Sequence, residues 1–245
     1  MSTPSTPSAI IVGVGAEQGL GAALCRLLAD KGYHVIIAGR TAAKIDQVAA
    51  AIQASGGSAE AIETDATDEA AVIRLFDHAF TTRDDIAAPD FVVFNAGINR
   101  QIAFRAVTAA QFEEFWRVCC FGGFLVGREA ARHLAPLGRG TVIFTGASAS
   151  LRGKAGFAQF AAAKAGLRMI SQSMAREFGP LGLHVAHTII DGGIDGERLR
   201  SRRPDVDADG LLNIDAIAES YWHIHRQHPS AWTQELDLRP YKENF

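Results

Sequence analysis

The sequence alternates short apolar runs with longer stretches of helical periodicity. Six runs have the length and composition of buried strands, at residues 9–12, 35–38, 61–64, 91–94, 141–145 and 185–190. Continuous apolar strands separated by amphipathic helices predict a parallel sheet that is covered on both faces. Right-handed crossovers make such a sheet doubly wound, and its ligands bind at the carboxyl ends of the strands. We therefore expect a three-layer α/β domain of the Rossmann type.

Composition limits the classes of partner that this domain is expected to bind. A chain of 245 residues that is 48% hydrophobic can bury one core of ordinary size. A net charge of −3 and a pI near 6.2 argue against a nucleic-acid or anionic-membrane surface. No stretch reaches transmembrane length, and the start of the chain lacks the basic region of a signal peptide. We expect a cytoplasmic protein that acts on a small molecule and binds neither nucleic acid nor membrane.

The chain reads as a disordered tail over residues 1–8, rich in Ser, Thr and Pro, followed by a single domain over residues 9–245. Within the domain, 195–228 reads as a loop and helix beside the substrate, and 229–245 as an apolar tail that packs on this subunit or a neighbour. The three cysteines, Cys25, Cys119 and Cys120, lack metal-site spacing. We expect free thiols and no metal.

A glycine-rich turn follows the first strand. Gly15, Gly19 and Gly21 have the spacing G-x-x-x-G-x-G, and a helix is expected from Leu20 to about residue 31. Without side chains the backbone can turn tightly and approach a pyrophosphate, while the helix presents its first N–H groups to the anion. The alternative is a glycine-rich turn with no ligand.

Two further motifs accompany this turn: Asn95-Ala96-Gly97 directly after the fourth strand, and Phe160-x-x-x-Lys164 in a later helix. Together the three motifs resemble the short-chain dehydrogenase/reductases over roughly residues 9–196. The resemblance implies a nicotinamide cofactor and an oxidoreductase. The cofactor-binding positions that it implies are Gly15, Gly19, Leu20, Gly21, Arg40, Asp65, Ala66, Asn95, Ala96, Gly97, Lys164, Gly192 and Ile194.

The end of the second strand bears on the choice of cofactor. Members of this family that prefer NAD commonly carry an acidic residue there, which holds the ribose diol and repels a 2′-phosphate. This chain has Gly39 and Arg40 instead. Because a guanidinium can bind a phosphate through two N–H groups, the sequence favours NADP(H), with NAD(H) as the alternative. A solvated arginine would look the same in the sequence.

The catalytic positions depart from the family pattern. Phe160 stands where the resemblance places the tyrosine that donates or accepts a proton, and a phenyl ring has no such proton. Ala147 stands at the serine position and Cys119 at the asparagine position. Ser148 lies one residue further along, and Lys164 is the remaining member of the usual four. Lys164 lies one helical turn from Phe160 and so on its face of the helix; a surface lysine is the alternative.

The sixth strand ends in a further departure. Asp191 replaces the proline that the family carries before Gly192. It is a candidate proton relay or a countercharge for a cationic substrate, and capping of the loop through backbone N–H groups is the alternative. Asp65 could likewise be a simple cap, with Thr67 or Asp68 as competing caps of the next helix. His187, within the strand, reads as a core histidine.

Three functions remain open. The first is a redox enzyme whose substrate is activated without a tyrosine, as an iminium or conjugated alkene is, or is protonated by Lys164, Asp191, Ser148 or water. The second is a protein that binds NADP(H) without turnover. The third is a non-redox enzyme on the same fold, which the intact glycines and Lys164 disfavour. The resemblance also implies a homo-oligomer, a tetramer or dimer, that uses the helices expected over 110–134 and 157–178.

Overall fold

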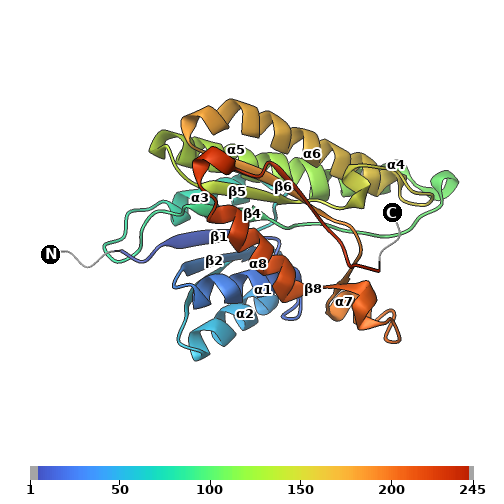
Figure 1. Cartoon of the computed structure of the whole chain (residues 1–245), viewed down its shortest axis with the longest axis horizontal. Coiled ribbons are helices and arrows are strands. Elements are labelled where there is room, and N and C mark those ends of the chain that lie inside the picture. Colours follow the sequence, from blue (N-terminus) through green and yellow to red (C-terminus); the bar gives the residue numbers. More distant parts are fainter. Residues whose placement is uncertain (1–4, 243–245) are drawn as a thin grey trace.

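A computed structural model describes residues 5–242 and shows a seven-stranded parallel sheet with helices on both faces (Figure 1). The strand order is β3-β2-β1-β4-β5-β6-β9. Strands β1 to β3 are added towards one edge and β4, β5, β6 and β9 towards the other, so the topological switch point of the sheet lies between β1 and β4. The predicted doubly wound Rossmann-type fold is confirmed. The strands are β1 (Ser8–Val12), β2 (His34–Gly39), β3 (Ser58–Glu63), β4 (Phe91–Phe94), β5 (Thr141–Thr145), β6 (His184–Ile190) and β9 (Glu235–Leu238).

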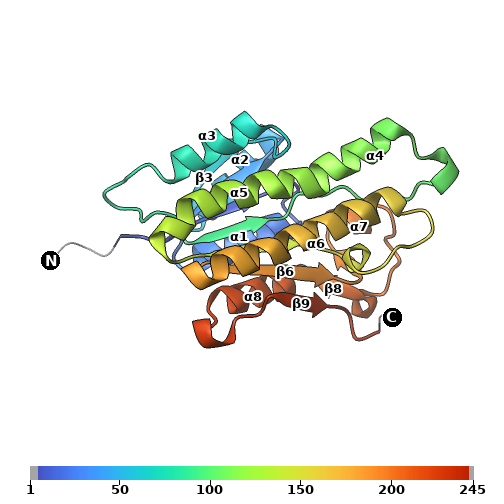
Figure 2. The ribbon, with the colours of Figure 1, turned by 90° about the horizontal axis from the view of Figure 1, so that it is seen from above.

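Two helical layers enclose the sheet, one above and one below it in Figure 1, and Figure 2 looks down on one of them. One layer packs α1 (Leu20–Asp30), α2 (Ala42–Ala54) and α8 (Ile214–His225) against one face. The other packs α3 (Glu69–Ala79), α5 (Gly122–Leu134) and α6 (Ala158–Phe178) against the opposite face. The central strands β1, β2, β4, β5 and β6 are buried along their whole length, which explains their continuous apolar runs.

Both edges of the sheet differ from expectation. β3 starts three residues before the expected run, because its exposed Ser58 and half-buried Glu60 interrupt the apolar pattern at its start. β9 was expected only as part of a packed tail, and the structure pairs it in parallel with β6. The tail expected over residues 1–8 also ends early: Thr6 pairs with Ile86, and Ser8 is buried in β1. Residues 1–4 and 243–245 lie outside the described residues.

The helix expected over 110–134 is divided. The segment α4 (Ala109–Trp116) begins at Thr108, whose side chain forms a capping box with Gln111. A π-helical turn, Arg117–Phe121, then joins α4 to α5. Such turns insert one extra residue per turn and are frequent at functional sites. Here the turn contains Cys119.

The segment after β6 is more ordered than the loop expected there. Short strands β7 (Gly193–Asp195) and β8 (Leu211–Asn213) pair in parallel, and α7 (Glu197–Arg200) lies between them. The C-terminal tail fastens this segment, because Lys242 contacts the carboxylates of Asp207 and Asp209 at 3.0 Å each. In Figure 1, α7 and β8 extend from the body of the molecule beside the carboxyl ends of the strands. Within residues 5–242, no helix combines the length and apolar character needed to span a bilayer.

Candidate functional site

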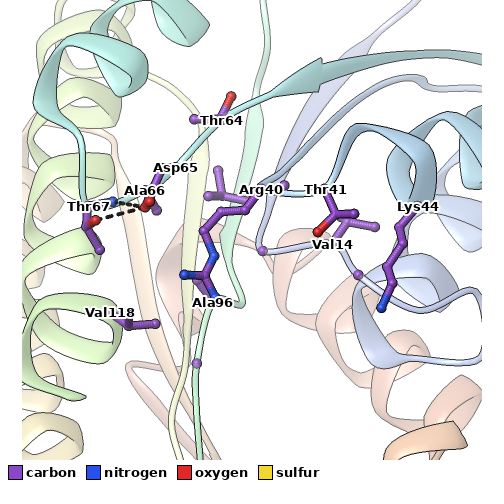
Figure 3. A pocket seen from close by; sticks show the side chains of 15 residues that line it. Val14, Arg40, Thr41, Lys44, Thr64, Asp65, Ala66, Thr67, Ala96 and Val118 are labelled. Atoms are coloured by element: carbon purple, nitrogen blue, oxygen red, sulfur yellow. Dashed lines mark hydrogen bonds between the residues drawn. The ribbon is translucent and has the colours of Figure 1, made fainter. Parts of the chain in front are cut away.

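A cavity of about 210 Å³ opens at the carboxyl ends of β1, β2 and β4, where the strand order reverses (Figure 3). Gly13 and Ala96 form its floor and are in tight contact: a Cβ at Gly13 would lie 2.3 Å from the backbone nitrogen of Ala96. Gly13 also has φ +92°, a left-handed conformation that favours glycine. Sequence reasoning did not assign Gly13 to the site, although its position in the glycine-rich turn was a signal.

The predicted glycines of the turn serve different purposes. A Cβ at Gly15 would meet nothing within 4 Å, so this residue faces the open cavity that it lines. Gly21 is packed closely, since a Cβ there would lie 3.1 Å from the Cα of Val14. Gly19 is the N-cap of α1, and Leu20 is buried as its first residue. The turn thus places free space beside the N-terminus of a helix, which suits the pyrophosphate of a dinucleotide.

The end of β2 supplies two cations to the cavity. Arg40 projects into the middle of the cavity in Figure 3, and Lys44, in the first turn of α2, flanks it together with Thr41. Lys44 was missed from the sequence, although it stands four residues after Arg40. Gly39 has no room for a side chain, because a Cβ would lie 2.3 Å from the carbonyl oxygen of Val14. An acidic residue at that position would require the backbone to move.

The opposite wall of the cavity follows β3. The Oδ1 atom of Asp65 accepts hydrogen bonds from the backbone N–H and the hydroxyl of Thr67, at 2.9 and 2.8 Å. Asp65 therefore closes its own turn as well as lining the cavity, while Asp68 caps α3. Ala66 lies beside it and also lines the cavity. On the far side of the cleft, Asn95 reaches back to the carbonyl oxygen of Gly13 and braces the glycine turn.

Lys164 is buried beneath the neighbouring loop rather than on the surface. Its Nζ donates to the carbonyl oxygen of Thr145 at 2.7 Å and lies 6.0 Å from the centroid of the Phe160 ring. A Cβ at Gly97, in the cavity wall, would lie 3.6 Å from this Nζ. Burial lowers the pKa of the Lys164 ammonium, and the nearby sulfur of Cys119 opposes that shift.

Apolar side chains surround the lysine. Phe160 is buried against Phe115, Val118 and Cys120, with Ala147 packed beside them. The thiol of Cys119 is also buried here, and its Sγ lies 3.5 Å from the backbone nitrogen and 3.7 Å from the carbonyl oxygen of Ile98. Cys119 thereby holds the loop after β4. The structure brings together the positions that the sequence marked as departures from the family pattern, and it places hydrocarbon and sulfur around the ammonium.

A serine that sequence reasoning missed lies under this loop. Ser150, not Ser148, makes the hydrogen bonds that the structure shows: its Oγ accepts from the backbone nitrogen of Ala147 at 3.2 Å and lies 3.1 Å from Nε2 of His187. Both partners are buried, and burial lowers the pKa of His187 to about 4. His187 is therefore neutral at physiological pH and holds the turn that carries Ala147 and Ser148.

Asp191 is buried and has a cationic partner. Its Oδ2 accepts from Nη2 of Arg152 at 2.9 Å, and Nη2 of Arg239 lies 3.8 Å away. Among residues 5–242 no backbone N–H group donates to its carboxylate, so the capping alternative has no contact that supports it in this part of the chain. Gly192 follows with φ +152°, and a Cβ there would lie 2.7 Å from Cδ of Pro240. Ile194, in β7, is half-buried.

Comparison with known proteins places these features in context. The family model described as short chain dehydrogenase matches residues 9–207. Gluconate 5-dehydrogenase of Gluconobacter oxydans is 29% identical over 70% of this chain and 66% of its own length. Cis-4-hydroxycyclohexanecarboxylate dehydrogenase of Sinomonas cyclohexanicum is 33% identical over 72% of this chain and 70% of its own length.

Solved structures agree with the fold over nearly the whole chain. A short-chain dehydrogenase from Rhodopseudomonas palustris is 36% identical with a TM-score of 0.83, and the match covers 97% of this chain and all of the other. An alcohol dehydrogenase of Thermococcus sibiricus, complexed with 5-hydroxy-NADP, is 21% identical with a TM-score of 0.84 and covers 97% and 98% of the two chains. The second match bears on the fold alone.

Proposed function

This chain belongs to the short-chain dehydrogenase family, and from that premise we propose that it is an NADP(H)-dependent oxidoreductase with a non-standard active site. The observation that carries the proposal is a cavity lined by Gly13, Gly15 and Arg40 at the carboxyl ends of the strands, with a buried Lys164 beside it. When bound, the cofactor supplies a hydride to the substrate or takes one from it. The residues that would hold it are those of the glycine turn, Arg40 and Lys44 at the adenosine end, and Lys164 at the nicotinamide ribose.

The chain's own residues would bind the substrate and supply its proton. Nζ of Lys164 donates one hydrogen bond to the carbonyl oxygen of Thr145. No other acceptor contacts this nitrogen among residues 5–242, so its remaining N–H donors can bind a ligand. With Phe160 and Ala147 in place of hydroxyl-bearing residues, the Lys164 ammonium is our candidate proton donor beside the cleft. We propose that it protonates the reduced substrate, or that the substrate is activated without an acid, as a conjugated alkene is.

Asp191 is a weaker candidate for the proton relay than the sequence suggested. Its Oδ2 is already engaged by the guanidinium of Arg152 at 2.9 Å, so the side chain is not free to exchange a proton with a substrate. The same pair removes the countercharge that a cationic substrate such as an iminium would need. We propose that Asp191 positions Arg152 and the loop after β5 instead.

The chain is expected to bind NADPH about ten- to a hundredfold more tightly than NADH, because Arg40 and Lys44 both face the adenosine end of the cavity. A hydrogen bond to a charged group contributes roughly 1.5 to 3 kcal/mol, which corresponds to that range of affinity. Calorimetric titration of both cofactors against the wild type, Arg40→Ala and Lys44→Ala measures this preference.

Each single variant should lose much of the preference for NADPH while its affinity for NADH changes little. The exposed Arg74→Ala, on the outside of α3, is the matched control for loss of a positive charge. Equal affinities for the two cofactors in the wild type would refute the assignment to NADP(H).

A protein that binds NADP(H) without turnover is the second candidate. It is favoured by the apolar cluster around Phe160, which offers no hydroxyl where a carbonyl would be polarised. Spectrophotometric assay of NADPH consumption separates the two functions. The panel should contain ketones, imines and enones, together with the oxidised forms of gluconate and 4-hydroxycyclohexanecarboxylate, whose dehydrogenases are similar to this chain. Consumption with any member of the panel supports the enzyme.

We also propose that the chain forms a homo-oligomer through the outer face of α5 and α6. A groove of about 490 Å³ lies between these helices, and Phe124 and Met169 at its border are exposed. Arg132 lines it from α5 and Glu177 from α6, so the groove has an apolar floor with charged residues at its border, as the contact between two copies of a chain often has.

Light scattering is expected to find a dimer or tetramer in the wild type, and Phe124→Glu is expected to shift the protein towards monomer because it places a charge in an apolar contact. Phe104→Glu, which alters an exposed aromatic residue outside the groove, is the control. A monomeric wild type would rule out this assembly.

A further inference from the structure

The segment after β6 crosses the cofactor cleft. At the start of α7, the backbone nitrogen of Glu197 donates to the carbonyl oxygen of Gln18, in the glycine turn, at 3.1 Å. The contact is close, because a Cβ at Gly196 would lie 2.8 Å from the same oxygen. α7 is therefore seated on one wall of the cleft, and its side chains are within reach of the other wall.

Arg198 makes the contact with that other wall. Its Nη2 donates to the carbonyl oxygen of Asn99 at 2.7 Å. Asn99 stands two residues after Gly97, which borders Lys164 and the thiol of Cys119. The guanidinium thus bridges the mouth of the cleft on the side where Lys164 and Phe160 lie.

Arg198 differs in its partner from two other arginines of this region. Arg152 pairs with Asp191, and Arg200 pairs with Asp195 through Nε and Nη2. For Arg198 the acceptor is a neutral carbonyl, and within residues 5–242 no carboxylate forms an ion pair with it. Arg198 is exposed, although partial desolvation and the charge of Arg202 still lower the pKa of its guanidinium.

We propose that Arg198 is a specificity-determining residue that binds the carboxylate of a monoanionic substrate, an inference that rests on the proposed function of the cleft. A guanidinium binds a carboxylate through two parallel hydrogen bonds and would exchange its single carbonyl contact for them. The rest of the substrate would be apolar, since Ile98, Ile102 and Phe157 pack beside the buried cluster around Phe160.

Calorimetry tests this assignment without requiring turnover. The protein, alone and saturated with NADP⁺, is titrated with hexanoate, cyclohexanecarboxylate, benzoate and phenylacetate, each paired with its neutral amide, and with cyclohexyl phosphate. At least one carboxylate should bind tenfold or more tightly than its amide, on the order expected for a hydrogen bond to a charged group. Arg198→Met should abolish this difference. Arg203→Met, which removes the same charge from an exposed position on the same segment, should preserve it.

Several results would overturn the proposal. The proposal is wrong if no carboxylate binds more tightly than its amide, if the preference survives in Arg198→Met, or if Arg203→Met loses the preference equally. Tighter binding of cyclohexyl phosphate than of every carboxylate would reassign the site to phosphate esters and reject the carboxylate. Binding of NADP⁺ is measured separately: its absence would refute the proposed function, while the carboxylate preference of the cofactor-free protein would still decide the role of Arg198.

Discussion

Lys164→Ala is expected to lower turnover by about 100- to 10,000-fold, the contribution typical of a positioned acid or base. The structure places the Lys164 ammonium against the apolar cluster around Phe160. The same change should weaken NADPH binding, because the ammonium would hold the ribose. Steady-state kinetics with a substrate from the panel and calorimetric titration of NADPH measure the two effects.

The pH dependence gives a second measure of the role of Lys164. An acid must be protonated to act, so the rate of reduction should fall as the pH rises through the pKa of Lys164. Burial lowers that pKa, and the fall should therefore begin below the ordinary range for lysine. Lys154→Ala, which removes an exposed lysine from the loop before α6, is the control. Full activity and an unchanged pH profile in Lys164→Ala would show that the lysine takes no part in the reaction.

The double variant Ala147→Ser with Phe160→Tyr is expected to gain carbonyl reductase activity, by about 100- to 10,000-fold if the phenol acts as a general acid. Both positions belong to the cluster that surrounds Lys164, and the Phe160 ring already lies beside the ammonium. A positive charge at this distance lowers the pKa of a phenol and so favours proton transfer near neutral pH. Reduction of several ketones by NADPH measures the gain.

The two single variants are the controls for this gain. Each should give less than the pair, since one supplies the acid and the other the group that polarises the carbonyl. Should the double variant fold with the wild-type melting temperature, bind NADPH and still reduce no ketone, the pocket around Phe160 would exclude such substrates and the family pattern would not explain the chemistry.

Much of the fold could be predicted because it depends on local pattern. The five central strands are buried on both faces, so each appears in the sequence as an uninterrupted apolar run. The edge strands were harder. The sequence Glu-Leu-Asp-Leu of β9 has charged residues at alternate positions and becomes a strand through its pairing with β6. The π-helical turn at Cys119 also left no periodic signal, since the residues on both sides are helical.

The site likewise has residues that the sequence could identify and contacts that only the structure shows. The glycine turn and Lys164 follow motifs of fixed spacing, and Arg40 follows the end of a strand; the structure places Gly15 and Arg40 in the lining of one cavity and Lys164 behind Gly97 in its wall. The contacts that qualify their roles join residues far apart in the chain, such as Arg152 with Asp191 and Arg198 with the carbonyl oxygen of Asn99. Such pairs depend on how the loops at the sheet edge meet, which no local pattern determines. For that reason Asp191 looked like an unpaired acid in the sequence.

The central claim is that this chain holds NADP(H) in the cleft with Lys164 beside the nicotinamide, and a crystal structure with NADPH tests it most directly. We expect the 2′-phosphate to contact Arg40 and Lys44, the pyrophosphate to lie along the glycine turn, and Nζ of Lys164 to donate to the nicotinamide ribose. Crystals grown with saturating NADPH that show an empty cleft, or a nicotinamide ring directed away from Lys164 and Phe160, would contradict the account.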